Sequence, residues 1–230
     1  MITSLSGRCV VFDLDDTLYD EIDFVRSGFA AVTSAVEARY RVNCGAELQD
    51  RISSGALINA FQDIAATMKL PHDAPAFMTE TYRTHSPTLR PRPGIPGLLA
   101  QLRARDGVVA CITDGRSLTQ RAKLSALDLT ALIDVVLISE ETGHAKPDAH
   151  NFEEMMQRVR ASEFWYVGDN PRKDFVAPNA LGWRTVGVRA PFGIHRIPES
   201  EWPTNGQPER WVDPAQLPAV WDEALAGHGP

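Results

Sequence analysis

The chain has 230 residues, 43% of them hydrophobic and 23% charged, which is typical of a globular protein with one sizeable core or two modest ones. The formal net charge of −7 and the lack of a Lys/Arg block argue against a surface that binds nucleic acid or lipid headgroups. Cys9, Cys44 and Cys111 are odd in number and far apart, and no apolar run approaches the length of a membrane span. We therefore predict a cytoplasmic protein with reduced thiols and with neither a nucleic-acid nor a membrane partner.

The first predicted strand is the apolar run CVVF, residues 9–12. A continuous apolar run of this length predicts a strand that is covered on both faces of a sheet. It is followed at once by Asp13, Asp15 and Asp16. Such a cluster of carboxylates suits a divalent cation, which prefers oxygen ligands.

Residues 19–90 are predicted to form a helical insert. Their apolar residues, such as Phe24, Phe29 and Val32, recur with helical spacing, and no strand-like alternation interrupts them. The segment ends in the proline-rich sequence PTLRPRPG, residues 87–94, which disfavours a helix and suits a linker. We assign residues 19–90 to an inserted domain with its linkers, and residues 1–18 and 91–230 to a core domain.

Beyond the linker, predicted strands and helices alternate. The strands are expected at residues 108–112, 135–138, 164–167 and 185–188, and the helices at residues 95–105, 118–127, 147–160 and about 175–181. This alternation predicts an α/β fold with a doubly wound parallel sheet. The tail from residue 191 is rich in proline and tryptophan and is expected to wrap the core.

Reactive side chains follow the ends of the first four strands, where open α/β sheets bind their ligands. In chain order these side chains are Asp13 and Asp15, then Thr113 and Asp114 with Gly115, then Lys146, and finally Asp169 and Asp174. Several carboxylates, one hydroxyl and one lysine are the groups that phosphoryl transfer requires. A carboxylate nucleophile meets a phosphate dianion only when a divalent cation offsets their repulsion.

The acidic residues divide between holding this cation and moving protons. Asp13 and Asp169 can hold the cation. Asp15, two residues beyond Asp13, can act as the general acid toward the leaving oxygen and as the base toward water. Asp16 has no role in this chemistry, and we expect it to be solvated or to cap a helix.

Four further groups can bind the phosphoryl oxygens. Lys146 supplies a positive charge, and Thr113 supplies a hydroxyl donor. The backbone amides of Asp114 and Gly115 supply neutral N–H donors beside that hydroxyl.

Four sequence motifs contain these residues: FDLDDTL at residues 12–18, ITDG at 112–115, KPD at 146–148 and VGDNPRKD at 167–174. Together and in this order they resemble the motifs of the haloacid dehalogenase superfamily of phosphohydrolases. The resemblance covers roughly residues 9–188 and implies a Rossmann-like core, a Mg²⁺ ion and an aspartyl-phosphate intermediate. The helical insert is similar to the α-helical, C1-type cap of one subfamily, which closes over small substrates.

The resemblance also implies a role for each motif residue. Asp13 would be the nucleophile and a metal ligand, and Asp15 the acid/base that lends its backbone carbonyl to the metal. Asp169 would be a metal ligand, and Asp174 would bind through water or orient a ligand. Thr113 and Lys146 would bind the phosphoryl group.

We therefore predict a Mg²⁺-dependent phosphohydrolase that cleaves a small phosphomonoester, with a small phosphorylated metabolite as its partner. A phosphomutase of the same superfamily stays open, because the motifs do not decide whether the phosphoryl group passes to water or to a second hydroxyl. A receiver-like signalling module is disfavoured by the large insert after the first strand. Dehalogenation needs no metal, and Asp15 and Asp169 argue against it.

Overall fold

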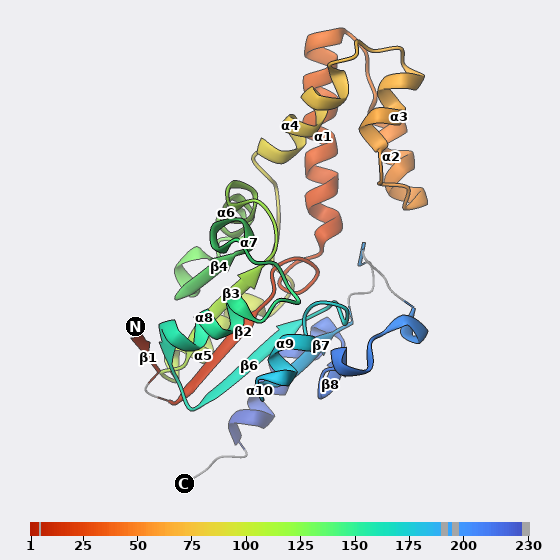
Figure 1. Cartoon of the computed structure of the whole chain (residues 1–230). Helices are drawn as coiled ribbons and strands as arrows, with labels where there is room; N and C mark the ends of the chain where they lie inside the picture. The colour runs from red at the N-terminus through yellow and green to blue at the C-terminus, as the bar shows by residue number, and fades with distance from the viewer. Residues whose placement is uncertain (5, 190–192, 195–197, 227–230) are drawn as a thin grey trace. The chain divides into compact units, whose positions relative to one another are not determined.

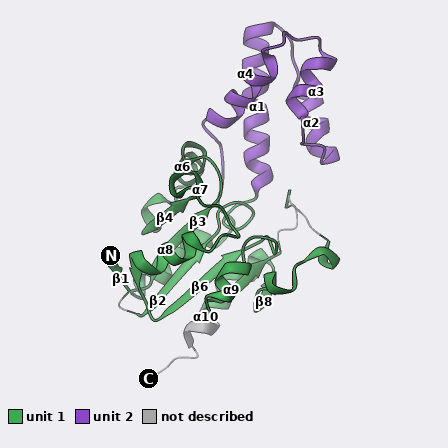
Figure 2. Ribbon diagram, viewed as in Figure 1, with its two compact units in different colours: residues 1–20, 90–230 green, residues 21–89 purple. Residues whose placement is uncertain are grey.

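The structure of the protein, a computed structural model, describes residues 1–4, 6–189, 193–194 and 198–226. The chain divides into two compact units (Figure 2). Unit 1 comprises Met1–Asp20 with Arg90–Pro230, and unit 2 comprises Glu21–Leu89.

Unit 1 is built around a six-stranded parallel sheet with the strand order β4-β3-β2-β6-β7-β8 (Figure 1). Its strands are β2 Arg8–Phe12, β3 Val108–Thr113, β4 Val135–Ile138, β6 Glu163–Gly168, β7 Arg184–Val188 and β8 Arg210–Val212. Each strand predicted from an apolar run is present. The predicted α/β class with a parallel sheet is confirmed.

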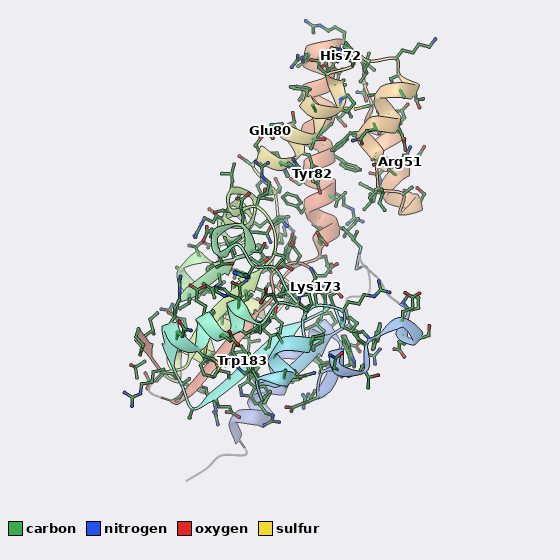
Figure 3. All side chains as sticks on the ribbon, in the orientation of Figure 1. Arg51, His72, Glu80, Tyr82, Lys173 and Trp183 are labelled. Carbon is green, nitrogen blue, oxygen red and sulfur yellow. The ribbon has the colours of Figure 1, made fainter. Side chains whose placement is uncertain are left out.

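Helices lie between the strands of unit 1 along the chain, and η4 and α10 follow the last strand. They are α5 Ile95–Ala104, α6 Ser117–Ala126, α7 Ser139–Thr142, α8 His150–Arg158, α9 Val176–Ala180 and α10 Leu217–Ala226, with short 3₁₀ turns η1 Thr130–Leu132, η2 Glu199–Glu201, η3 Thr204–Gly206 and η4 Pro214–Gln216. On one face of the sheet, Cys9 and Val11 pack with Phe152 and Met155 of α8. Trp183, labelled in Figure 3, belongs to the same hydrophobic cluster.

The helix predicted at residues 147–160 is shorter than expected, for two reasons. The Asp148 carboxylate accepts a hydrogen bond from the backbone N–H of His150 at 2.9 Å, which favours a turn before the helix. At the other end, β5 Val159–Arg160 pairs in parallel with β1 Ile2–Thr3. The small β1–β5 sheet is not visible in the sequence pattern, because each strand has only two residues.

The tail differs from the expectation that it wraps the core. Strand β8 adds an edge to the main sheet beside β7, and Trp211 of β8 lies opposite Gly187. Trp221 of α10 is buried, with its ring centroid 4.8 Å from that of Trp165 on β6. The tryptophans of the tail therefore belong to the packing of the sheet itself.

Unit 2 is all helical, with α1 Glu21–Tyr40, α2 Gly45–Ser54, α3 Ala60–Thr67 and α4 Ala74–Thr84. Phe29, Phe61 and Tyr82, the last labelled in Figure 3, form a cluster of rings with centroids 5.6–5.9 Å apart. Gly28 is required on α1, because a Cβ there would lie 2.4 Å from the Tyr82 ring. No helix in the described part of the chain is long and apolar enough to cross a membrane.

Candidate active site

The order of the sheet fixes where the site lies. From β2 the chain runs outward through β3 to β4, and later returns to β6 on the other side of β2. Strand order thus reverses at β2, and ligands of open α/β sheets bind at the carboxyl ends of the strands beside such a point. Asp13 follows β2, Thr113 ends β3 and Asp169 follows β6. The backbone N–H of Asp13 donates to the carbonyl of Val167 at 2.8 Å, which links the end of β2 to β6.

Lys146 lies at the centre of the site, with its side chain fully buried. Its Nζ is 2.6 Å from Oδ1 of Asp13, 2.7 Å from Oδ1 of Asp174 and 2.9 Å from the hydroxyl oxygen of Tyr166. An ammonium has three N–H groups, so all three have an acceptor here. Lys146 therefore contacts two of the carboxylates that the sequence analysis placed in the site. It also contacts Tyr166, which the sequence analysis did not single out.

Burial and charge shift the pKa values of this cluster. Burial, with a further contribution from the Asp174 carboxylate, raises the pKa of Asp13 to about 6 against the opposing effect of Lys146. Burial raises the pKa of Asp169 well above its usual range, and the charges of Asp174 and Asp13 add to it. Burial alone would lower the pKa of Lys146, but Asp13 and Asp174 outweigh it and keep the ammonium charged.

Three buried or half-buried carboxylates gather beside this lysine. Asp13, Asp169 and Asp174 each place one oxygen within 4.8 Å of those of the other two. Both oxygens of Asp174 are engaged, because Oδ1 accepts from Lys146 and Oδ2 accepts from the backbone N–H groups of Asp169 and Asn170. Hard oxygen donors with an excess of negative charge fit a divalent cation, and two of the three, Asp13 and Asp169, have raised pKa values.

The carboxylate of Asp15 lies outside this acidic cluster and instead meets α6. Lys123 Nζ is 2.7 Å from its Oδ1 and 2.9 Å from its Oδ2, and Gln120 Nε2 donates to Oδ2 at 3.0 Å. The hydroxyl of Tyr19 donates to Oδ1. Burial alone would raise the pKa of Asp15, but the Lys123 charge and these hydrogen bonds together lower it. The role implied for its backbone carbonyl toward a metal stays a prediction.

The predicted phosphoryl-binding residues lie in different surroundings. Thr113 is buried, and its hydroxyl oxygen accepts from Gln120 Nε2 at 2.6 Å, which leaves the hydroxyl proton for donation elsewhere. The Asp114 carboxylate accepts from the backbone N–H of Lys146 at 3.1 Å. The Gly115 amide donates to Ser139 Oγ at 2.9 Å, so it must exchange this partner before it can bind a phosphoryl oxygen.

Lys173 stands beside the loop that carries Asp114. Its Nζ is 3.8 Å from Oδ2 of Asp114, and Figure 3 shows it among the loops at the carboxyl ends of the strands. The second basic side chain of this region thus comes from the final acidic motif, directly before Asp174.

The expectation that Asp16 is solvated or caps a helix is wrong. Asp16 is only 2% exposed, and its Oδ2 accepts from the backbone N–H of Ile194 at 3.1 Å. Its carbonyl oxygen accepts from Arg92 at 2.8 Å. Its φ of 52° places it in the left-handed region, which Asp tolerates better than most residues. Asp16 therefore fixes the turn after β2 by joining it to two distant segments.

Sequence reasoning also missed Gln120, Lys123 and Tyr166. A signal was available for the first two, because Gln120, Lys123 and Leu124 share one face of a helix at spacings of three and four, and all three are buried. A lysine and a glutamine on the apolar face of a helix need polar partners inside the fold. Tyr166 is different, since its position inside a buried strand reads as ordinary core packing.

Comparisons with known proteins agree with this arrangement. The haloacid dehalogenase-like hydrolase family matches residues 10–188. A glyceraldehyde 3-phosphate phosphatase of Methanocaldococcus jannaschii is 30% identical over 78% of this chain and 83% of its own. A ribulose-1,5-bisphosphate 5-phosphatase of Halopiger xanaduensis is 28% identical over 78% of this chain and 84% of its own.

Solved structures share the fold at low sequence identity. A candidate β-phosphoglucomutase of Thermotoga maritima gives a TM-score of 0.71 at 19% identity and covers 95% of this chain and 100% of its own. A magnesium-bound candidate hydrolase of Bacillus subtilis, described as revealing interdomain movement, gives a TM-score of 0.69 at 16% identity, with 93% and 97% covered. The resemblance drawn from the four motifs, and with it an enzyme of the phosphatase type, is confirmed.

Proposed function

The chain belongs to the haloacid dehalogenase-like hydrolase family, and we propose that it is a Mg²⁺-dependent phosphatase that forms its intermediate on Asp13. One observation carries this proposal. The buried Asp13 carboxylate, at the point where the sheet order reverses, is paired with Lys146 and grouped with Asp169 and Asp174. Phosphoryl transfer to a carboxylate requires a nucleophile, a positively charged side chain and further carboxylates that can hold a metal ion, and these residues supply all three.

Asp13 would attack the phosphorus of the ester. The bond from phosphorus to the leaving oxygen breaks as the bond to the Asp13 oxygen forms, which gives an aspartyl phosphate and the alcohol. Lys146, already 2.6 Å from Asp13, would shift one N–H toward a phosphoryl oxygen and so counter the charge of the substrate. The Thr113 hydroxyl would donate to another phosphoryl oxygen.

Asp13 and Asp169 are the residues that would hold Mg²⁺, and Asp174 would keep Lys146 and the loop after β6 in place. When bound, the ion supplies positive charge that offsets the repulsion between carboxylate and phosphate and polarises the phosphoryl oxygens. The raised pKa values of Asp13 and Asp169, which come first from burial and then from repulsion by neighbouring carboxylates, support this assignment, because a bound cation would offset both effects.

Asp15 would carry the protons of both steps. In the first step it would give a proton to the leaving oxygen, and in the second it would remove a proton from water as that water attacks the aspartyl phosphate. The second step releases inorganic phosphate and restores the Asp13 carboxylate. The contacts with Lys123 and Gln120 lower the pKa of Asp15 and favour its carboxylate form, which the second step needs. The first step would use the minor protonated form, and the proton taken from water in the second step would restore it.

The names of the curated relatives support a hydrolase over a mutase. Both relatives described above are called phosphatases, and both act on phosphorylated sugars by name. We propose a small phosphorylated metabolite, with short-chain sugar phosphates as the first class to test. The candidate phosphoglucomutase is only 19% identical, so its likeness supports the fold alone.

Unit 2 would act as a cap of the α-helical, C1 type. Its place in the chain directly after β2 and its all-helical structure support this assignment. The three buried free thiols support a reducing compartment such as the cytoplasm.

The test is hydrolysis by the purified chain, with Mg²⁺ and with chelator, of aryl phosphate and of a panel of sugar phosphates. Phosphate release that needs Mg²⁺, together with acid-quenched mass spectrometry that maps phosphate to Asp13, is the expected result. A phosphoryl group on another residue overturns the role of Asp13, and undiminished turnover in chelator overturns the role of the metal. Transfer of phosphate to a second hydroxyl, without release, would identify a mutase.

A further inference from the structure

Both oxygens of the Asp15 carboxylate accept hydrogen bonds from side chains of α6. Lys123 contacts both of its oxygens, at 2.7 and 2.9 Å, and the Lys123 side chain is only 5% exposed. Donors to both oxygens of a planar carboxylate fix its rotation as well as its position. Burial of an ammonium is costly, so this pair is retained only where its geometry is favourable.

Gln120 joins the same carboxylate to the phosphoryl-binding hydroxyl. Its Nε2 donates to Asp15 Oδ2 at 3.0 Å and to Thr113 Oγ1 at 2.6 Å, and Gln120 itself is 2% exposed. Gln120 and Lys123 lie three residues apart on one face of α6, which begins four residues after Thr113. A single helix therefore sets the distance between the group that moves protons and the group that binds phosphate.

We propose that α6, through Lys123 and Gln120, positions the Asp15 carboxylate to remove a proton from the water that hydrolyses phosphorylated Asp13. This inference rests on the proposed function. Lys123 and Gln120 are positioning residues, because they act through Asp15. A base works only when its lone pair is aimed at the proton that it takes, so a carboxylate left to rotate should slow this step more than the first.

The variants Lys123→Met and Gln120→Met test the proposal. Methionine matches the length of glutamine and is one atom shorter than lysine, and each substitution removes the hydrogen-bond donors of the side chain. The substrate is an activated aryl phosphate, whose leaving group needs little protonation, so formation of the aspartyl phosphate does not depend on Asp15. The readouts are turnover and the fraction of enzyme phosphorylated at steady state, by acid-quenched mass spectrometry.

For Lys123→Met we expect turnover to fall by about 10-fold or more while the phosphorylated fraction rises, because only breakdown of the intermediate is slowed. Gln120→Met should change both quantities in the same direction by a smaller factor. A merely structural role would lower turnover and the phosphorylated fraction together, in proportion to the enzyme that stays folded.

Arg121→Met is the matched control on the same helix. Arg121 makes a two-pronged ion pair with Glu141, at 2.8 Å for both contacts, but at the surface and away from Asp15. Its turnover and phosphorylated fraction should match those of the unmodified protein. If Lys123→Met or Gln120→Met behaves like this control, or loses both quantities in parallel, the proposal is overturned.

Circular dichroism melting shows whether each variant is folded. Should Lys123→Met fail to fold, Gln120→Met decides the question, because it buries no unpaired charge of its own. If the proposed function is wrong, the unmodified protein itself will form no phosphorylated Asp13. That result would overturn both the proposed function and the role of α6. If the unmodified protein forms that intermediate, only the behaviour of the α6 variants bears on this inference.

Discussion

Lys146 and Asp13 are 133 residues apart in the chain, yet Nζ of Lys146 lies 2.6 Å from Oδ1 of Asp13. Both side chains are almost completely buried. Asp174 shares the same ammonium at 2.7 Å. One positive charge therefore balances part of the negative charge of two buried carboxylates, and most of the behaviour expected of the site follows from this imbalance.

Lys146→Met should destabilise the metal-free protein. The variant leaves Asp13 and Asp174 buried without their cation, which typically costs about 3–5 kcal/mol. Denaturant unfolding at pH 7.5 in chelator measures the loss, and phosphatase activity should vanish. Lys69→Met, which removes an exposed lysine of unit 2, is the control and should change the free energy of unfolding by less than about 0.5 kcal/mol. A loss for Lys146→Met no larger than that of the control would contradict the assignment.

Asp13→Asn and Asp15→Asn should fail at different steps. The first removes the nucleophile, so no phosphorylated protein should form. The second keeps the nucleophile, so with an activated aryl phosphate the phosphorylated protein should accumulate while turnover falls by about 10²- to 10⁴-fold. Mass spectrometry after acid quench distinguishes the two, with Asp50→Asn on the exposed side of α2 as control. Phosphate on Asp13→Asn would rule out Asp13 as the acceptor.

Binding of Mg²⁺ should strengthen as pH rises from 5 to 7.5. Asp13 has a pKa raised to about 6, so at pH 5 it is mostly protonated and the ion must displace that proton. An ordinary aspartate, with a pKa of about 3.9, is already ionised at pH 5 and would give little dependence over this range. The increase in melting temperature on adding Mg²⁺ should therefore be larger at pH 7.5.

The control for this pH dependence is Asp13→Asn, which lacks the Asp13 proton while Asp169, whose pKa is also raised, keeps its own. This variant should show a smaller Mg²⁺-induced shift and a smaller difference between the two pH values. Equal shifts at pH 5 and 7.5 in the unmodified protein would mean that Asp13 does not contribute to the metal site.

Gly168→Ala should disturb the site without replacing a charged residue. Gly168 ends β6, and a Cβ there would lie 2.6 Å from Oδ2 of Asp174, so the carboxylate must move off the amides it accepts from. We expect a loss of about 1–3 kcal/mol in stability and a fall in activity of about 10-fold or more. Gly97→Ala on α5 is the control, because a Cβ there meets nothing within 4 Å. It should keep full activity and gain up to about 1 kcal/mol in stability. Full activity in Gly168→Ala would show that the position of Asp174 is unimportant.

Limited proteolysis tests whether unit 2 moves as a cap. Cleavage should concentrate in the linker at residues 87–94, and a metallofluoride that mimics the phosphoryl group should protect it in the presence of Mg²⁺. Fragments identified by mass spectrometry give the cleavage sites. Cleavage spread along the chain and unchanged by the mimic would argue against closure.

The sequence determined by itself the features that depend on short stretches of chain. The strands β2, β3, β4, β6 and β7 could be predicted because each is an apolar run covered on both faces, and such runs are visible locally. The helical insert could be predicted because amphipathic spacing is also local. Most of the candidate site could be predicted as well, because its residues follow directly on those strands and parallel strands end at the same edge of a sheet.

Only the tertiary structure decided what those residues touch. Lys123 and Gln120 on α6 became partners of Asp15, and Tyr166 became a partner of Lys146, through contacts between segments far apart in the chain. Asp16 looked like a solvated residue and is instead buried, with its carboxylate accepting a hydrogen bond from the backbone N–H of Ile194. The physical reason is that a buried polar group must find a partner, but which partner it finds depends on sheet order and helix packing, and no stretch of sequence around the group contains that information.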